Sequence, residues 1–190
     1  SLALAFVIPM ICFYTNVARI SKGHENYKNI YSLCVDYVQI SSPGFGDFLK
    51  ERVPEIDKVT SPILNNVWYD IENTNRKIHH VDKDFFYFFP AKFSKGGIDF
   101  LDNPNSIAVS KEFADYLAKS GPVIGREIDH NSNRYIVNAV FDEYGSNVLS
   151  GCDILMNNEA IRKSGHNDFI HRHRGSMTFF SVNPSADMDE

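Results

Sequence analysis

The chain has 190 residues, of which 43% are hydrophobic and 23% are charged, which is enough apolar material for one globular domain or for two small domains that share a core. This composition excludes a disordered protein. The formal net charge is -5, and no run of basic residues is long enough to follow a phosphate backbone, so nucleic acid is not an expected partner.

An uncharged apolar run opens the sequence, from Leu2 to Ala18, and Arg19 and Lys22 follow it. The run is slightly shorter than the roughly 20 residues that cross a bilayer core. Three interpretations remain open: a buried core helix, the hydrophobic region of a signal peptide, or the outer end of a membrane helix. The run lacks a basic leader and is apolar on every face, which favours the third. We therefore expect residues 1–22 to be the end of a transmembrane helix.

The next part of the chain is predicted to hold three strands and a helix. Residues 31–37 alternate between apolar and polar types, the period-2 pattern of a half-buried strand. Residues 45–53 predict a short helix that ends at Pro54, and residues 59–68 and 69–81 predict two strands, the second split from the first by a turn or bend in the polar stretch DIENTNRK. The helix places four apolar residues on one face: Phe45, Phe48, Leu49 and Val53. This order of elements indicates a small α+β layer unit.

The densest aromatic stretch of the sequence follows, FFYFF at residues 85–89. Asp82 is placed to cap a short helix that ends at Pro90, with Phe85, Phe86 and Phe89 on one side. So short a helix cannot form alone, because nucleation costs more than a few backbone hydrogen bonds return. Packing of the rings must hold it. We predict that the rings form a buried plug; the alternative is an exposed patch that binds a partner.

The second half of the chain is predicted as short strands around one helix. The helix begins at Ser110 as its cap, buries an apolar face, and ends at Gly121 and Pro122. That face holds Phe113, Ala114 and Leu117. The strands are expected at 107–109, 135–141 and 177–182. Residues 157–175 are polar and without periodicity, so they predict a long surface excursion, and a further helix is expected to begin at residue 184.

The histidines do not predict a metal site. His79 and His80 are adjacent, so on a strand they face opposite sides and cannot readily bind one ion together. His166, His171 and His173 lie among arginines that would repel a cation, and we interpret them as part of a solvated loop.

Other chemistry-bearing motifs are also missing from the sequence. Cys34 and Cys152 allow a disulfide without requiring one, and the cysteine spacing excludes CxxC sites. No phosphate-binding glycine loop, GxSxG motif or assignable carboxylate pair occurs. The sequence therefore predicts no catalytic, cofactor-binding or metal-binding residue.

Four segments carry a resemblance to a known family. They read VDKDFFYFFPAKFSKG, PNSIAVSKEFADYLAK, GPVIGREI and YIVNAVFDEYGSN. In this order and spacing they resemble the extracytoplasmic (periplasmic) core domain of MacB-like and FtsX-like ABC transporter permeases, over residues 2–190. The most specific part is the expected strand and helix in PNSIAVSKEFADYLA, followed by GPVIG.

The resemblance implies an α+β fold of two subdomains, preceded by the end of a transmembrane helix. One is a porter-like α/β layer unit, and the other is an inserted, largely β unit called sabre-like. The implied boundaries are 1–22 for the membrane helix end, 23–81 and 176–190 for the porter-like part, and 82–175 for the insertion. The family pattern continues past Glu190 with a helix and a strand, so the porter-like part is expected to be incomplete here.

The resemblance also implies a function without catalysis, because the ATPase of the family is a separate chain or segment. The domain would transmit ATP-driven conformational change to an external partner or substrate, in export or in lipoprotein or peptide handling. The implied partners are the membrane, a separate ABC ATPase subunit, a second permease in a homodimer or heterodimer, and an extracytoplasmic partner protein. The implied location is the inner (cytoplasmic) membrane, with this domain facing the periplasm.

Two other functions remain open from the residues. One is an extracytoplasmic sensor or small-ligand binding module, whose site would be the loop at 157–175 or the aromatic stretch. The other is an enzyme whose residues converge only in the fold, around His79 or His166.

Overall fold

The computed structural model describes residues 30–32, 44–142, 149, 151–158 and 176–183. The expected transmembrane segment, Cys34, the loop histidines and the helix expected from residue 184 all lie outside these residues. Within the described part of the chain, no helix is long and apolar enough to cross a membrane.

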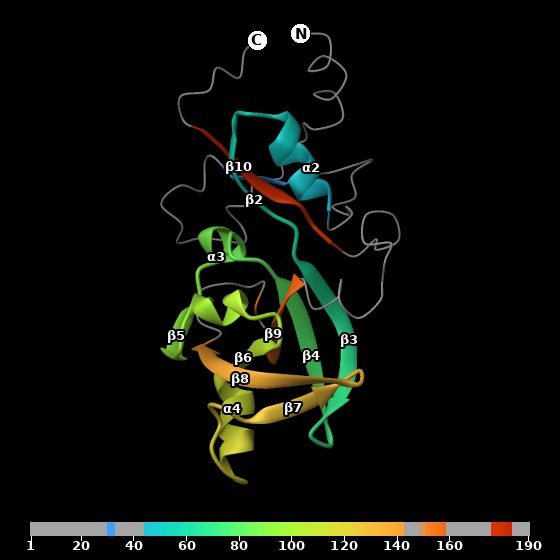
Figure 1. The fold of residues 1–190 in the computed structure, drawn as a ribbon, viewed down its shortest axis with the longest axis vertical. Coiled ribbons are helices and arrows are strands. Elements are labelled where there is room, and N and C mark those ends of the chain that lie inside the picture. Colours follow the sequence, from blue (N-terminus) through green and yellow to red (C-terminus); the bar gives the residue numbers. More distant parts are fainter. Residues whose placement is uncertain (1–29, 33–43, 143–148, 150, 159–175, 184–190) are drawn as a thin grey trace.

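The smaller of two sheets has three strands in the described residues, in the order β1-β10-β2, and both pairings are antiparallel. The strands are β1 (Ile30–Ser32), β2 (Ile56–Thr60) and β10 (Phe179–Val182). Helix α2 (Phe45–Arg52) precedes β2 and packs against this sheet. The central strand of the sheet therefore comes from the far end of the described chain (Figure 1).

The larger sheet has seven strands in the described residues, in the order β3-β4-β9-β6-β8-β5, with β7 paired to β8. Two pairings, β4 with β9 and β6 with β8, are parallel. The strands are β3 (Ile63–Ile71), β4 (Thr74–Val81), β5 (Lys92–Lys95), β6 (Ser106–Ser110), β7 (Glu127–His130), β8 (Asn133–Asp142) and β9 (Ile154–Asn157). The helices here are α3 (Phe85–Phe88), the 3-10 helix η4 (Ile98–Asp102) and α4 (Lys111–Ala118). The predicted α+β class is confirmed.

Helix α4 forms where its sequence signals place it. The Ser110 hydroxyl accepts a hydrogen bond from the Phe113 backbone N–H at 3.2 Å, as the predicted cap requires. Phe113, Ala114 and Leu117 are buried against the larger sheet. The helix is thus held by a polar contact at its start and an apolar stripe along one face.

Helix α2 confirms its prediction in part. Leu49 is 1% exposed and packs on the small sheet, but Phe48, which was expected on the same buried face, is 42% exposed. Its ring lies under the Arg52 guanidinium, 4.2 Å from the ring centroid. A helix of eight residues covers the small sheet with a narrow stripe, so the outer part of the apolar face stays in solvent.

The predicted boundaries of the strands at 59–68 and 69–81 were wrong, but the turn predicted in the stretch DIENTNRK is confirmed. The chain leaves the small sheet after β2 and enters the large sheet at β3, with Ser61 and Pro62 between them. Proline has no N–H to donate to a ladder, which accounts for the break. The second break falls at Glu72 and Asn73, whose φ angles of 54° and 58° form the two-residue turn of the β3–β4 hairpin.

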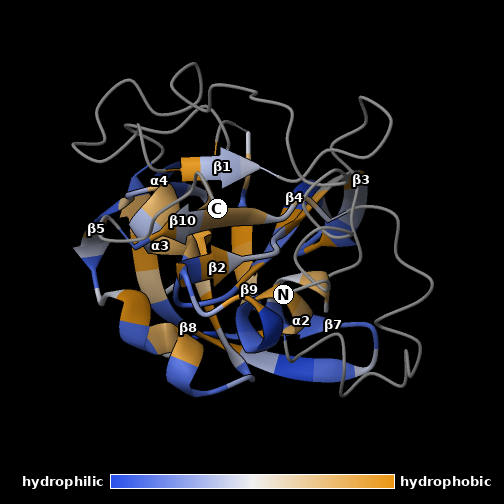
Figure 2. Cartoon of the chain, turned by 90° about the horizontal axis from the view of Figure 1, so that it is seen from above, coloured by the Kyte–Doolittle hydropathy of each residue, from blue (hydrophilic) through white to orange (hydrophobic). Residues whose placement is uncertain are grey.

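Three hydrophobic clusters lie within the part of the chain that the structure describes. One lies between α2 and the small sheet, and a second lies between α4 and the large sheet. The third takes residues from both sheets and surrounds α3. In Figure 2 hydrophobic colour is seen on the central strands, such as β2 and β10, whereas β7 is largely hydrophilic. The expected division of the chain at residue 82 stays a prediction, although β4 shares a sheet with β9, whose residues follow that boundary.

Candidate functional site

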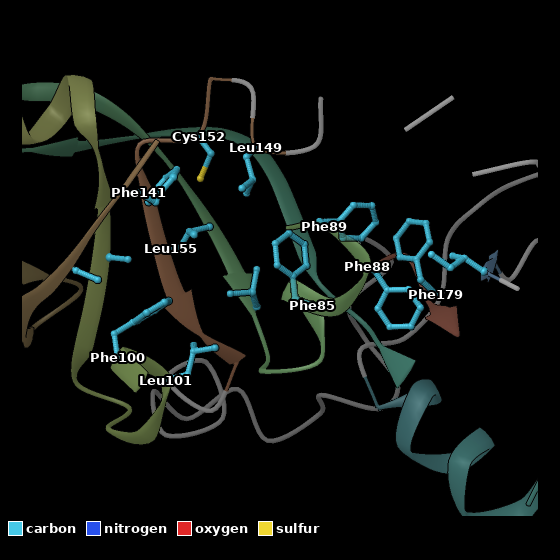
Figure 3. Close-up of a cluster of buried hydrophobic side chains, with 14 residues drawn as sticks. Phe85, Phe88, Phe89, Phe100, Leu101, Phe141, Leu149, Cys152, Leu155 and Phe179 are labelled. Carbon is cyan, nitrogen blue, oxygen red and sulfur yellow. The ribbon is translucent and has the colours of Figure 1, made fainter. Parts of the chain in front are cut away.

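The aromatic helix α3 lies where the two sheets meet. Phe85, Phe88 and Phe89 are all 0% exposed, which confirms the predicted plug. The Phe89 ring contacts the Phe179 ring of β10 edge-on at 4.9 Å between centroids, and the Phe85 ring lies 5.0 Å from that of Phe89 (Figure 3). The sequence predicted Phe86 in this set, but the third fully buried ring is that of Phe88. Phe88 and Phe89 follow Phe85 by three and four residues, so all three lie on the same helix face.

Phe86 still contributes to the junction, on its outer side. Its ring meets the rings of Phe93 and Phe100 at 5.5 and 6.3 Å. Further inward the same cluster includes Phe141 of β8 and Leu155 of β9 (Figure 3). We call this third hydrophobic cluster, which surrounds α3, the α3 cluster. It joins β10 of the small sheet to the central strands of the large sheet through continuous apolar contact.

The packing at α3 is large relative to the stability of a typical domain. Complete burial of one phenylalanine side chain contributes about 1.5–3 kcal/mol, so the three fully buried rings of α3 contribute on the order of 5–9 kcal/mol. Whole domains are stable by only about 5–15 kcal/mol. Separation of the two sheets would expose part of this surface, so the apolar contact favours movement of both sheets as one body.

Asp82 connects the two sheets through polar contacts. Its Oδ2 accepts hydrogen bonds from the Thr60 hydroxyl at 2.8 Å and from the Ser61 backbone N–H at 3.3 Å. Its Oδ1 accepts from the Phe85 backbone N–H at 2.9 Å, so it binds the first N–H of the aromatic helix as predicted, although the residue at the N-cap position is Asp84, whose side chain makes no capping hydrogen bond. The carboxyl thus binds the end of β2 and the start of α3 at once.

Burial raises the pKa of Asp82 to about 6. The three hydrogen bonds act in the opposite direction, since they stabilise the carboxylate, and the charge of Asp84 adds a smaller upward effect. Loss of hydration therefore outweighs the hydrogen bonds at this carboxyl. A group with this pKa changes charge close to neutral pH.

Asp84 makes a second set of contacts across the junction. Lys50 of α2 and Lys58 of β2 each place Nζ 3.6 Å from one of its carboxylate oxygens. All three side chains are partly exposed, so solvent screens these ion pairs and each contributes about 0–1 kcal/mol. Their effect is to orient α2 and β2 toward the start of α3.

The short link between the sheets, which we call the Ser61 connection (Ser61 and Pro62), is tightly packed. The Ser61 hydroxyl lies 2.9 Å from that of Thr178, and the Pro62 carbonyl accepts from the Met177 N–H at 3.3 Å. A Cβ on Gly46 would lie 2.6 Å from Ser61 Oγ. Only glycine therefore lets α2 approach the link this closely.

The adjacent histidines of β4 are buried. His79 and His80 are 5% and 7% exposed on β4. Burial, with smaller effects from the nearby His130 and His79, lowers the pKa of His80 to about 3, so its imidazole is neutral at ordinary pH. Among the described residues, no three histidine, cysteine, aspartate or glutamate side chains are grouped so that they could hold a metal ion.

Cys152 is buried, and its Sγ lies 3.3 Å from the Ile154 carbonyl oxygen. The pairing of Cys152 with Cys34, which the sequence allows without requiring, involves a residue outside the described part of the chain. The expectation that the chain has no catalytic, cofactor-binding or metal-binding residue stays a prediction. Sequence reasoning placed Asp82 only at the start of the aromatic helix. It missed the contacts with Thr60 and Ser61, because no local pattern marks a partner some twenty residues earlier.

Comparison with solved structures finds the same fold in proteins of low sequence identity. A permease protein domain from Porphyromonas gingivalis superimposes with a TM-score of 0.62 at 16% identity, over 79% of this chain and 72% of that one. The periplasmic region of MacB from Actinobacillus actinomycetemcomitans gives 0.59 at 10% identity, over 92% and 81%. The extracellular domain of the noncanonic ABC-type transporter YknZ from Gram-positive bacteria gives 0.54 at 12% identity, over 82% and 83%.

No curated protein sequence matches the chain. The sequence model of the MacB-like periplasmic core domain, in contrast, matches residues 1–190. This match agrees with the resemblance carried by the aromatic helix and the Ser110-capped helix. The chain therefore belongs to the MacB-like periplasmic core domain family and is an extracytoplasmic domain of a MacB-like ABC transporter permease.

Proposed function

We propose that this domain transmits ATP-driven movement of permease membrane helices to a partner or substrate outside the membrane. The observation that carries the proposal is the α3 cluster, which gives the two sheets one shared core. A lever must move as a unit, and fully buried rings at its junction resist bending more than an exposed link would. The contacts of Asp82 and Asp84 across the same junction support the proposal.

The partners follow from the family and belong to the same proposal. Residues 1–22 would anchor the domain in the inner membrane, with the two sheets facing the periplasm. A separate ABC ATPase subunit would supply the movement, and a second permease would complete a homodimer or heterodimer. An extracytoplasmic protein or substrate would receive the movement. The domain itself would catalyse no reaction.

We further propose that the functional division of the chain follows the sheets. The porter-like part would comprise β1, α2, β2 and β10, and the inserted part would run from β3 to β9. The division then falls at the Ser61 connection and again between residues 158 and 176, and the expected boundary at residue 82 moves upstream. The pairing of β4 with β9 in one sheet supports this placement.

The buried rings of α3 do not favour the sensor function. Phe85, Phe88 and Phe89 have no exposed surface with which to bind a ligand. The other candidate for a sensor site, the polar loop, lies outside the described residues from residue 159 onward.

Distances between spin labels in the intact permease would test the lever. One label replaces Glu51 on α2 and the other replaces Asp115 on α4, both exposed, in a background in which Cys12 and Cys34 are serine. Cys152 is 0% exposed and would not react. We expect one narrow distance distribution that is the same with and without ATP, while distances between the two permeases of a dimer change.

The matched control is a label pair within the large sheet, at Lys92 on β5 and Asp115. This pair should stay narrow when Phe89 is replaced by alanine, whereas the Glu51–Asp115 pair should broaden. A Glu51–Asp115 distance that changes with ATP in the native protein would show that the junction bends, and the rigid lever would be rejected.

A further inference from the structure

The Asp82 carboxyl is the point at which a single proton could change the attachment of the two sheets. It holds Thr60 and Ser61 at the end of β2 and the first N–H of α3. Breaking these contacts would free the Ser61 connection from the aromatic helix, while the remaining contacts of each sheet would stay intact.

The charged groups around Asp82 leave it without a cation among the described residues. Lys50 on α2 and Lys58 on β2 both pair with Asp84, and Lys83 pairs with Asp102. His80 of β4, two residues before Asp82, is neutral, and β10 contributes no titratable residue. The only charge that acts on Asp82 from its own segment is the like charge of Asp84. A carboxylate at this position is therefore buried without charge compensation.

We propose that Asp82 is a proton-operated latch between the two sheets: the protonated carboxyl holds the Ser61 connection against α3, and loss of the proton favours its release. The proposal rests on the proposed function, since it assigns a control to the junction of the lever. The protonated acid can keep the contacts, because the Thr60 hydroxyl both donates and accepts and can reverse its role. The carboxylate would instead gain hydration when the connection opens.

The expected size of the effect follows from linkage. In the closed form, in which Asp82 contacts Thr60, Ser61 and Phe85, the pKa of Asp82 is raised from 3.8 to about 6. In an open form, in which these contacts are broken and the carboxyl is hydrated, the pKa has its ordinary value. Stabilisation of the closed form is then complete below pH 3.8 and is lost as the pH rises through 6. Between pH 4.5 and 7.5 the opening equilibrium should increase by about 25-fold.

Amide hydrogen exchange of the 190-residue chain, measured by NMR from pH 4.5 to 7.5, would test the latch. After correction for the intrinsic pH dependence of exchange, the Ser61 and Phe85 amides should open about 25-fold more at the upper pH. The Phe113 amide is the internal control, since it also donates to a side chain at a helix start, but to the neutral Ser110 hydroxyl. Its protection should not change with the titration of Asp82.

Two variants make the test specific. Asp82→Asn is a neutral isostere of the protonated acid, so its Ser61 and Phe85 amides should show less than about a twofold change over the same range. Thr60→Val removes a hydrogen bond that lowers the pKa of Asp82, so the midpoint of the exchange change should move to higher pH. If Asp82→Asn does not fold, the direction of the Thr60→Val shift decides.

The latch would be rejected by pH-independent protection of both amides in the native chain, by an unchanged pH dependence in Asp82→Asn, or by a downward midpoint shift in Thr60→Val. These outcomes are separate from those of the spin-label test. Exchange in the isolated chain reports on the carboxyl whether or not the domain transmits movement, and the label distances report on movement whether or not a proton controls it.

Discussion

Replacing Phe89 by alanine should destabilise both sheets together. The Phe89 ring is 0% exposed and contacts Phe85 of α3 and Phe179 of β10, so its loss leaves a cavity at the point where the two sheets share a core. Removal of a fully buried phenylalanine side chain costs about 3–5 kcal/mol. With a urea dependence of about 2 kcal/mol per molar, the unfolding midpoint should fall by about 2 M.

Two optical signals can follow this unfolding. The chain has 1 tryptophan, Trp68, which lies on β3 of the large sheet with the Lys77 ammonium 4.8 Å from its ring centroid, so its fluorescence reports on that sheet. Far-UV circular dichroism averages over both sheets. We expect the two transitions to coincide in the native chain and to shift together in Phe89→Ala, as a shared core requires.

Phe48→Ala is the matched control for this experiment. That ring is 42% exposed on α2, outside the α3 cluster, so its loss should cost less than about 1 kcal/mol. The reasoning would be refuted if Phe89→Ala cost as little as Phe48→Ala, or if the dichroism transition moved while the tryptophan transition stayed in place. The second result would mean that the small sheet unfolds without the large one.

Three further predictions concern the packing and charges around the junction. Gly46→Ala should lower the free energy of unfolding by about 1–3 kcal/mol, because the new Cβ would lie 2.6 Å from Ser61 Oγ; chemical denaturation would measure it, and an unchanged midpoint would contradict the close approach of α2. His80 and Asp82 should give opposite pH slopes. Folding lowers the pKa of His80 to about 3, so the contribution of His80 to the free energy of unfolding is fully present above pH 6.5. This contribution falls by about 2 kcal/mol as the pH is lowered from 7 to 5. Because the pKa of Asp82 is raised, its contribution to the free energy of unfolding increases by about 1 kcal/mol as the pH falls from 7 to 5. From pH 7 to pH 5, the free energy of unfolding measured by chemical denaturation should therefore fall more in Asp82→Asn than in the native chain. An equal fall in both proteins would contradict both pKa shifts. Asp153→Ala should lower the free energy of unfolding by about 3 kcal/mol, because the Asp153 carboxylate pairs with the poorly exposed Arg76 guanidinium at 2.9 Å and accepts a hydrogen bond from the Lys77 N–H. Chemical denaturation would measure this loss, and a value below about 1 kcal/mol would show that solvent screens the ion pair.

The elements that the sequence predicted well are those whose signals are local. Helix α4 carries its cap, its apolar stripe and its glycine stop within a dozen residues, and the structure confirms the cap and the stripe. The burial of α3 was predictable for a different reason: a helix of four residues has to be held by its side chains.

The elements that the sequence missed depend on partners far along the chain. Strand β9 has only four residues and lies between β4 and β6, with both faces covered, so it shows no alternation. Strand β7, with the sequence EIDH, has little apolar character and forms because β8 pairs with it. The contact between Phe89 and Phe179 was equally hidden, since no pattern near either residue indicates the other.

The order of strands in the small sheet has a consequence for biosynthesis. Its outer strands, β1 and β2, do not pair with each other, and β10, which separates them, is the last strand of the described chain to be synthesised. A nascent chain can therefore complete the large sheet while the small one still lacks its middle strand. During that interval Leu49 and Val59 have no β10 to cover them, so a ribosome-bound chain that ends before Phe179 should be the form that chaperones and proteases recognise.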